Sequence, residues 1–267
     1  MTAAPSDSNP IRQWFEASQR LFARVEAQEK EIAQAAEWFA RSILAGRVVH
    51  AFGAGHSRMP IEELWPRYGS FPGFNPIVEL SMTFHHPVVG CNGQRQAMFL
   101  ENVPGFAARI LRNFVLDPID SALIVSSSAG SLVAIEMAEE FRRRGIRVVA
   151  IVSLDHAASC PAKRADGLKL TDVADLVLDT GAPEGDAMVS IEGLDAKVAP
   201  GSTIGSCLLV NAIKADLARR LVEGRQPPRV LAAANVVGAA RSAAMFESAY
   251  DEHARRLARL FQHPESE

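Results

Sequence analysis

The chain has 267 residues and carries 28 Lys and Arg against 31 Asp and Glu, a formal net charge of −3. This balance argues against binding to a polyanion such as DNA, and 48% hydrophobic with 22% charged residues excludes intrinsic disorder. Because Cys91, Cys160 and Cys207 lie far apart, we expect neither a disulfide framework nor a zinc site, and a cytoplasmic location. The first residues lack the basic-then-apolar order of a signal peptide, and no segment approaches the ~20 apolar residues of a membrane span.

Residues from about 10 to 45 are predicted to form one long amphipathic helix. Apolar side chains such as Trp14, Phe22, Ile32 and Phe39 recur at helical spacing, with charged side chains on the other face. Gly46 supplies a stop signal. Such a helix either covers its own sheet or also packs against a second subunit, and the pattern leaves both alternatives open.

Five short apolar runs follow, separated by helical patterns. The runs are 47–53, 75–80, 121–127, 146–154 and 174–181. They are rich in Val, Ile and Leu without clean alternation, which is typical of parallel strands buried on both faces. The clearest helical patterns are 131–145, 203–223 and a final one at about 239–263. The alternation predicts a doubly wound α/β sheet in a single domain spanning residues 1–267.

In such sheets ligands bind beyond the carboxyl ends of the strands, which directs attention to the loop AFGAGHSRM after the first run. Two glycines, one of them Gly55, permit a tight turn, and Ser57 can cap the next helix. The turn can present N–H groups and a hydroxyl to an anion. A dinucleotide-binding GxGxxG would need glycine at the position of Arg58, so we expect no nucleotide cofactor.

A second loop, VSSSAGSL, follows the third run. Its serines, Ser126, Ser127, Ser128 and Ser131, together with the N–H groups of a helix start, can cradle a phosphate without a lysine. It is not a P-loop, because GKS or GKT is absent, and the alternative is a helix cap with spare serines. A third loop, 179–187, leads toward a helix that Ser202 or Thr203 is expected to cap.

Taken together, AFGAGHS, VSSSAGS, LVLDTGAPEGDA and PGSTIGSCLLVNAI resemble the sugar isomerase (SIS) domain, a phosphosugar-binding module, over roughly residues 30–220. The resemblance implies a three-layer αβα sandwich with a five-stranded parallel sheet of the flavodoxin-like type. It also implies a homodimer or homotetramer with active sites at subunit interfaces. By resemblance, Ser57 contacts sugar or phosphate oxygens, and Ser126, Ser128 and Ser131 hold the phosphate. Ala129 stands where glycine is usual, and Gly130 could restore the loop conformation one residue later.

Isomerisation of a sugar between aldose and ketose needs a base and an acid. Glu62 and Glu63 lie one turn beyond Ser57, and His56 lies beside it; these are the predicted catalytic residues. The alternatives are solvated carboxylates and a loop histidine bonded to backbone. Further candidates are Glu79, His85, His86, Glu101 and His253, with Glu184 and Asp186 expected to contact hydroxyls. No HxxxH or HxH spacing occurs, so no metal is expected.

The favoured hypothesis is an aldose–ketose isomerase acting on a sugar phosphate by Glu/His acid–base catalysis. One alternative is a lyase or etherase on an amino-sugar phosphate, which would use the same scaffold and a glutamate base. Another is a non-catalytic protein that senses a phosphosugar. No helix-turn-helix pattern is present, and neither a nucleic acid nor a membrane is expected as a partner.

Overall fold

The computed structural model describes residues 9–83 and 93–262, and at its centre lies a five-stranded parallel sheet with the strand order β2-β1-β3-β4-β5. The strands are β1 (Val49–Gly53), β2 (Phe74–Ile77), β3 (Ser121–Val125), β4 (Arg147–Val152) and β5 (Leu176–Asp179). All five expected strands are therefore confirmed, with bounds a few residues shorter than the apolar runs. The central strand β3 is buried along its whole length, as expected for a sheet covered on both faces.

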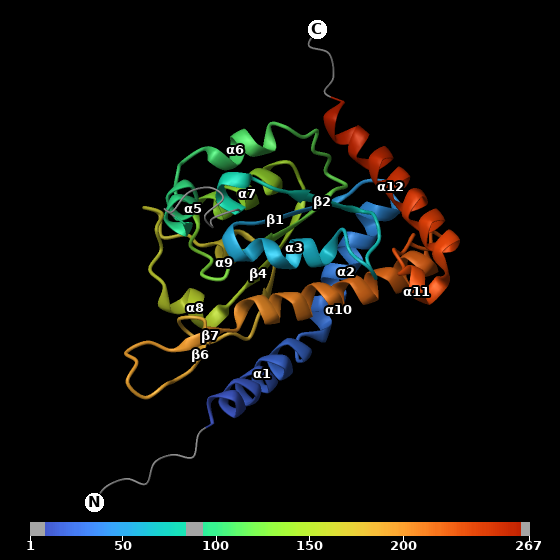
Figure 1. Ribbon diagram of the computed structural model, residues 1–267. Coiled ribbons are helices and arrows are strands. Elements are labelled where there is room, and N and C mark those ends of the chain that lie inside the picture. Colours follow the sequence, from blue (N-terminus) through green and yellow to red (C-terminus); the bar gives the residue numbers. More distant parts are fainter. Residues whose placement is uncertain (1–8, 84–92, 263–267) are drawn as a thin grey trace, which may run out of the picture.

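Helices cover the two faces of the sheet (Figure 1). On one face lie α2 (Glu29–Leu44), α3 (Met59–Leu64) and α10 (Ser202–Glu223). On the other lie α6 (Phe106–Leu111), α7 (Leu132–Arg143) and α9 (Leu170–Val173). Alternate strand residues feed the two cores, so that Leu123 packs into the first and Ile124 into the second. The three-layer αβα sandwich is confirmed.

Shorter elements complete the sheet edges. They are α4 (Leu80–Thr83), α5 (Gln94–Leu100), α8 (Leu154–Ser159) and α11 (Ala234–Val237), with an antiparallel pair, β6 (Ala187–Val189) and β7 (Val198–Pro200). The β6–β7 pair was not predicted; β6 begins at the last residue of the third loop, 179–187. The predicted C-terminal helix is α12 (Ala239–Phe261), and residue 263 lies outside the described residues. Within residues 9–83 and 93–262, none of the helices combines the length and apolar character needed to cross a lipid bilayer.

The predicted single helix over residues 10–45 is wrong: the segment forms two helices, α1 (Pro10–Glu26) and α2. The break falls at Ala27 and Gln28. The Gln28 amide makes two hydrogen bonds with the backbone of Asp179 at the end of β5, donating to its carbonyl at 2.8 Å and accepting from its N–H at 2.7 Å. This pairing across 151 residues requires the chain to turn at Gln28, and no local glycine or proline signals it.

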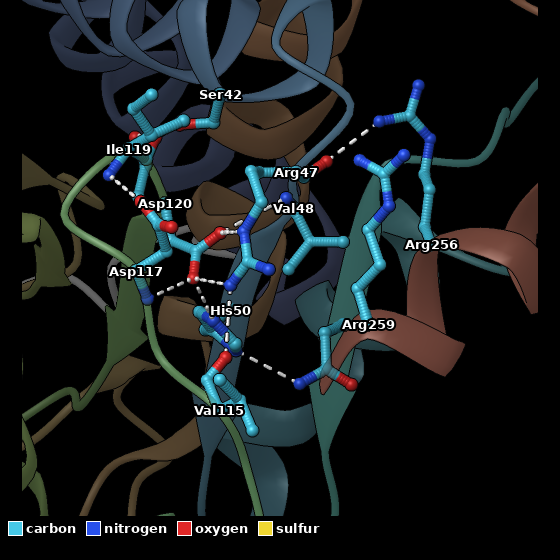
Figure 2. A network of polar contacts seen from close by, with 12 residues as sticks. Ser42, Arg47, Val48, His50, Val115, Asp117, Ile119, Asp120, Arg256 and Arg259 are labelled. Atoms are coloured by element: carbon cyan, nitrogen blue, oxygen red, sulfur yellow. Dashed lines mark hydrogen bonds and ion pairs between the residues drawn. The ribbon is translucent and has the colours of Figure 1, made fainter. Parts of the chain in front are cut away.

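A buried polar network joins the amino ends of β1 and β3 (Figure 2). Asp120 accepts two hydrogen bonds from Arg47, at 2.9 and 2.7 Å, and faces His50 Nε2 at 3.2 Å. The amide Nδ2 of Asn75 in β2 lies 3.0 Å from His50 Nδ1. We therefore assign the proton of His50 to Nε2, which donates to Asp120. The network ties three strands together on the edge opposite their carboxyl ends.

Candidate functional site

The first loop begins where β1 ends at Gly53 and continues as a short 3-10 turn, Gly55–Arg58. The turn folds back so closely that a Cβ at Gly53 would lie 2.1 Å from the carbonyl oxygen of Ser57. Only glycine fits there, and Gly55 also adopts a positive φ of 54°. The two glycines thereby place His56 and Ser57 at the carboxyl edge of the sheet.

The second loop follows β3 and contains an unusual alanine. Ala129 itself adopts the left-handed conformation, with φ 54°, so the expectation that Gly130 would supply it is wrong. An alanine in this region costs roughly 1–2 kcal/mol. The conformation is held by two hydrogen bonds: the Ala129 N–H donates to Ser126 at 3.1 Å, and its carbonyl accepts from Leu170 at 2.9 Å. Its methyl group is fully buried, which helps to fix the loop.

The two loops line one cleft of about 240 Å³ at the carboxyl edge of the sheet. Six of the predicted site residues lie in its wall: Gly55, His56, Ser57, Ser126, Ser127 and Ser128. Side chains from other elements complete it: Gln94, Glu101, His156 and Asp186. A smaller adjoining hollow shares His56, Ser57, Ser127 and Asp186 and extends to Ser202 and Thr203. Residues far apart in the sequence therefore meet where the strand-end rule places a ligand.

The serine hydroxyls of the second loop have different surroundings. Ser127 donates to Ser153 at 3.2 Å, and Ser153 in turn lies 2.6 Å from the Thr180 hydroxyl. Ser128 accepts a long hydrogen bond, 3.4 Å, from the Gly130 N–H. Ser131 does not line the cleft; it occupies the N-cap position of α7 without a capping bond from its side chain, and its buried hydroxyl makes no hydrogen bond within the described part of the chain.

Glu101 is the carboxylate of the cleft with the most perturbed acidity. It follows α5, and its side chain faces the cleft beside Ser131. Burial raises the pKa of the Glu101 carboxyl above its usual range, while the neighbouring Ser131 hydroxyl and the charge of Lys163 oppose the shift. A carboxyl with a raised pKa in a cleft is suited to proton transfer near neutral pH.

Two histidines line the cleft. His56 was predicted; it is exposed at the mouth. His156 was missed by the sequence reasoning, although it lies only four residues after β4 ends at Val152. Its Nδ1 accepts a hydrogen bond from the Gly185 N–H at 3.2 Å, so we assign the proton of the neutral ring to Nε2. The strand-end rule, applied to β4, would have found it.

Asp186 caps α10 although it lies 15 residues before Gly201 in the sequence. Its carboxylate accepts hydrogen bonds from the N–H groups of Gly201 and Ser202, at 3.1 and 2.7 Å, and from the Ser202 hydroxyl at 2.7 Å. The expectation that Ser202 or Thr203 caps this helix is therefore wrong, because the N-cap position is Gly201. A carboxylate at a helix N-terminus is favourable for the helix dipole.

Glu62 and Glu63 lie outside the cleft, in contrast to the prediction. Glu62 is exposed and paired with Arg58 at 2.6 Å. Glu63 accepts from Asn211 at 2.9 Å and pairs with Arg67. Burial would raise the pKa of Glu63, but these two partners outweigh it and lower the pKa. The short helix α3 directs both carboxylates to a separate surface groove, where ion pairs one helical turn away hold them.

The remaining candidates lie elsewhere. Glu79 accepts a hydrogen bond from the Ser81 hydroxyl at 2.7 Å, and Glu184 is exposed. His253 packs against Trp65 with 5.1 Å between ring centroids. His85 and His86 lie outside the described residues. Among the side chains that the structure describes, no three His, Cys, Asp or Glu residues gather closely enough to hold a metal ion.

Comparison with known proteins places this geometry in a family. A model of the SIS domain matches residues 13–153. A UPF0309 protein of Oceanobacillus iheyensis is 31% identical over 214 residues, which cover 80% of this chain and 85% of that protein. A UPF0309 protein of Thermoanaerobacter pseudethanolicus is 32% identical over 216 residues, 79% and 85% of the two chains. The structure of phosphoheptose isomerase GmhA from Neisseria gonorrhoeae has a similar fold, with a TM-score of 0.50, 15% identity, and coverage of 78% of this chain and 96% of that one.

Proposed function

Because this chain belongs to the SIS domain family, we propose that it binds a sugar phosphate in the cleft between the two serine loops and interconverts its aldose and ketose forms. One observation carries the proposal: Ser57 from the first loop and Ser126, Ser127 and Ser128 from the second line the same cleft. The similar fold of a phosphoheptose isomerase is consistent with this substrate class.

The phosphate would be held by neutral donors. No lysine or arginine lines the cleft among the described residues, although the charge of Lys163 reaches Glu101, so the direct contacts must come from hydroxyls, loop N–H groups and the N-terminus of α7. Helix N-termini and loops that contain left-handed residues bind phosphate in this way. Ala129 is such a residue. The energetic cost of the left-handed conformation of Ala129 is then part of the cost of forming the phosphate site.

We assign the base to Glu101 and acid assistance to His56 and His156. In the isomerisation, the base removes a proton from the carbon next to the carbonyl and returns it to the former carbonyl carbon, through an enediol. A second group moves a proton between the two oxygens. Glu101 combines a place in the cleft wall with a raised pKa, and either histidine can serve the oxygens. Glu62 and Glu63 are instead held by ion pairs in another groove.

The binding step is tested with a Ser126→Ala/Ser128→Ala variant. Thermal stability is measured with a panel of sugar phosphates and their unphosphorylated parents. Binding at 100 times the dissociation constant adds about 2.7 kcal/mol to the free energy of unfolding, and we expect this gain for a phosphorylated sugar only. The variant should fold and lose the gain, whereas Ser190→Ala, at an exposed serine that directly follows β6, should keep it. Equal gains in all three proteins would remove the serines from the site.

The chemical step is tested by NMR on the sugar phosphate that binds. Interconversion of aldose and ketose, lost in Glu101→Gln with binding retained, is the expected result. Elimination of a substituent instead of isomerisation would make the protein a lyase or etherase. Binding without any turnover would make it a phosphosugar sensor.

We also propose that the protein is a homo-oligomer through α1, whose first turns project beyond the rest of the molecule (Figure 1), whereas Leu21 and Val25 near its end are buried. Ile11, Phe15 and Phe22 are 67%, 57% and 53% exposed, and their spacing puts them on one face of the helix. A second copy of this chain is the partner that we infer. Phe15→Ser/Phe22→Ser should reduce the mass measured by light scattering, and Arg20→Ser on the opposite face should not. An unchanged mass in the double variant would contradict this interface.

The domain organisation that we propose is a single SIS domain extended by α1 and α12. Arg256 of α12 donates to the carbonyls of Ile43 and Arg47, at 3.0 and 2.8 Å, which fastens the last helix to the start of the sheet. Limited proteolysis should therefore leave α12 attached to the remainder. Cys160 and Cys207 are free thiols, which is compatible with the reducing cytoplasm that we propose as the location.

A further inference from the structure

A second cavity, of about 380 Å³, lies at the amino edge of the sheet, where α12 passes the segments that precede β1 and β2. Gly46 and Pro72, which come shortly before these strands, form part of its wall. The serine cleft lies at the carboxyl ends of the same strands, so the two cavities occupy opposite edges of the sheet. In Figure 1, α12 and α11 accordingly lie on the side away from α5 and α8. Nothing in the proposed isomerase chemistry uses this second cavity.

Four arginines line the cavity against one carboxylate. They are Arg229, Arg255, Arg256 and Arg259, and the carboxylate is Glu252. Glu252 is shared by two of them, with Arg256 at 2.8 Å and Arg229 at 3.4 Å. The lining therefore carries an excess of positive charge that the cavity itself does not neutralise. Gathering like charges is unfavourable unless an anion joins them.

Backbone carbonyls fix three of the guanidinium groups in place. Arg256 is only 11% exposed and donates to the segment before β1 (Figure 2). Arg229 donates to the Ser248 carbonyl at 2.9 Å, and Arg259 to the Gly46 carbonyl at 3.2 Å. A Cβ at Gly46 would lie 2.9 Å from the Arg259 guanidinium, so the glycine makes room for it. Preorganised donors of this kind lose little entropy when they bind an anion.

Two of the four arginines have no carboxylate partner. Arg259 has only the carbonyl contact, and Arg255, which is exposed, makes no hydrogen bond or ion pair with the described part of the chain. Guanidinium groups bind phosphates bidentately. A phosphate monoester carries a charge of about −1.5 to −2 at pH 7, which matches two uncompensated guanidinium groups better than a single carboxylate does.

The rest of the wall is apolar except for Gln226, whose amide donates to the Leu44 carbonyl. Ile43, Pro72, Leu221 and Pro228 contribute to it, and the first three are buried in the fold. The cavity thus offers an apolar surface beside a cationic one, and its size is at the lower end of small-molecule sites. We propose that this cavity is a second binding site, for a small organic phosphate with an apolar body, independent of the serine cleft.

The test uses phenyl phosphate as the probe, with inorganic phosphate and phenol as its two halves, measured by isothermal titration calorimetry on the full chain. We expect phenyl phosphate to bind more tightly than either half. Arg255→Gln/Arg259→Gln should weaken it at least about tenfold, because two charged hydrogen-bond donors are lost. Both positions are exposed on α12, so the variant should fold, which circular dichroism checks.

Two matched variants separate this site from the serine cleft. Arg241→Gln changes an exposed arginine of the same helix that does not line the cavity, and Ser126→Ala/Ser128→Ala alters the cleft alone. Both should bind phenyl phosphate as the unmodified protein does. Binding that is lost in the serine variant and kept in the arginine variant would overturn the second site and support the cleft instead. Absence of binding to the unmodified protein, or equal binding in all variants, would also overturn it.

Discussion

The buried network of Figure 2 allows a quantitative prediction for Asp120→Asn. Asp120 is 2% exposed and its two oxygens accept five hydrogen bonds. Two come from Arg47, one from His50, and one each from the N–H groups of Val48 and Asp117. Asparagine offers one acceptor oxygen and places an NH₂ group against donors. It also leaves the Arg47 guanidinium, whose side chain is 12% exposed, without its counter-charge.

The expected loss in the free energy of unfolding is about 3–5 kcal/mol, the range for removing one partner of a buried ion pair. For a chain of this size each kcal/mol lowers the melting temperature by about 2–4 °C, so a fall of roughly 6–20 °C is expected. The difference should depend on pH. Burial would raise the pKa of Asp120, but hydrogen bonds from His50 and Arg47 outweigh it and lower the pKa.

Because the folded-state pKa lies below the unfolded value of about 3.9, the stabilisation by Asp120 is complete above that value and is lost as the pH falls through the folded-state pKa. Urea unfolding followed by circular dichroism at pH 7 and in acid measures both effects. Asp117→Asn serves as control: the Asp117 side chain accepts one hydrogen bond, from the exposed Ile119 N–H, which an amide oxygen can also accept, and its charge is the weakest of the influences that raise the pKa of Arg47. A loss below about 1 kcal/mol for Asp120→Asn at pH 7, within the usual range of a single hydrogen bond, would refute the reasoning.

Three further changes test other parts of the molecule. Glu101→Gln should lower turnover by about 10²–10⁴-fold. Because burial raises the pKa of Glu101, the variant should unfold at a higher urea concentration than the unmodified protein at pH 8, and at the same urea concentration at pH 4. Equal urea midpoints at pH 8 would contradict the presence of a buried carboxylate. Gly53→Ala should abolish ligand-induced stabilisation, because the new Cβ would lie 2.1 Å from the Ser57 carbonyl oxygen. The control is Gly130→Ala, whose Cβ would have no neighbouring atom closer than 3.7 Å and which should fold normally. A Gly53→Ala protein that binds the ligand normally would show that the loop adapts. Gln28→Ala removes two hydrogen bonds to the Asp179 backbone and should lower the free energy of unfolding, measured by chemical denaturation, by about 1–3 kcal/mol. A loss near zero would mean that the break between α1 and α2 has another cause.

The sheet and its main helices could be predicted from the sequence because each leaves a local signature. Parallel strands buried on both faces must be largely apolar, as β3 and β4 are after their first residues, Ser121 and Arg147. Helix α10 carries its apolar pattern over six turns, and the prediction misses its start by one residue. The turn at Gln28 has no such signature, because its cause is a hydrogen-bonding partner on β5.

Part of the cleft could be predicted because its serines also leave a local signature in the sequence. The serines follow strands directly, so the strand-end rule finds them. Glu101 lies in a segment with little periodicity, and it reaches the cleft because its carbonyl accepts from the Val133 N–H in α7 at 2.9 Å. Proximity along the chain favoured Glu62 and Glu63, but the direction of a short helix, which turns them toward Arg58 and Arg67, cannot be obtained from spacing alone.

The cap on α10 has a consequence for ligand selectivity. Asp186 already places a carboxylate at the positive end of that helix, and the same residue lines the cleft and the adjoining hollow. A sugar with phosphates at both ends would bring its second phosphate toward this resident anion, where like charges repel. The first phosphate would still have the N-terminus of α7. We therefore expect the proposed phosphosugar site to favour monophosphates over bisphosphates by exclusion, without a side chain dedicated to rejecting the latter.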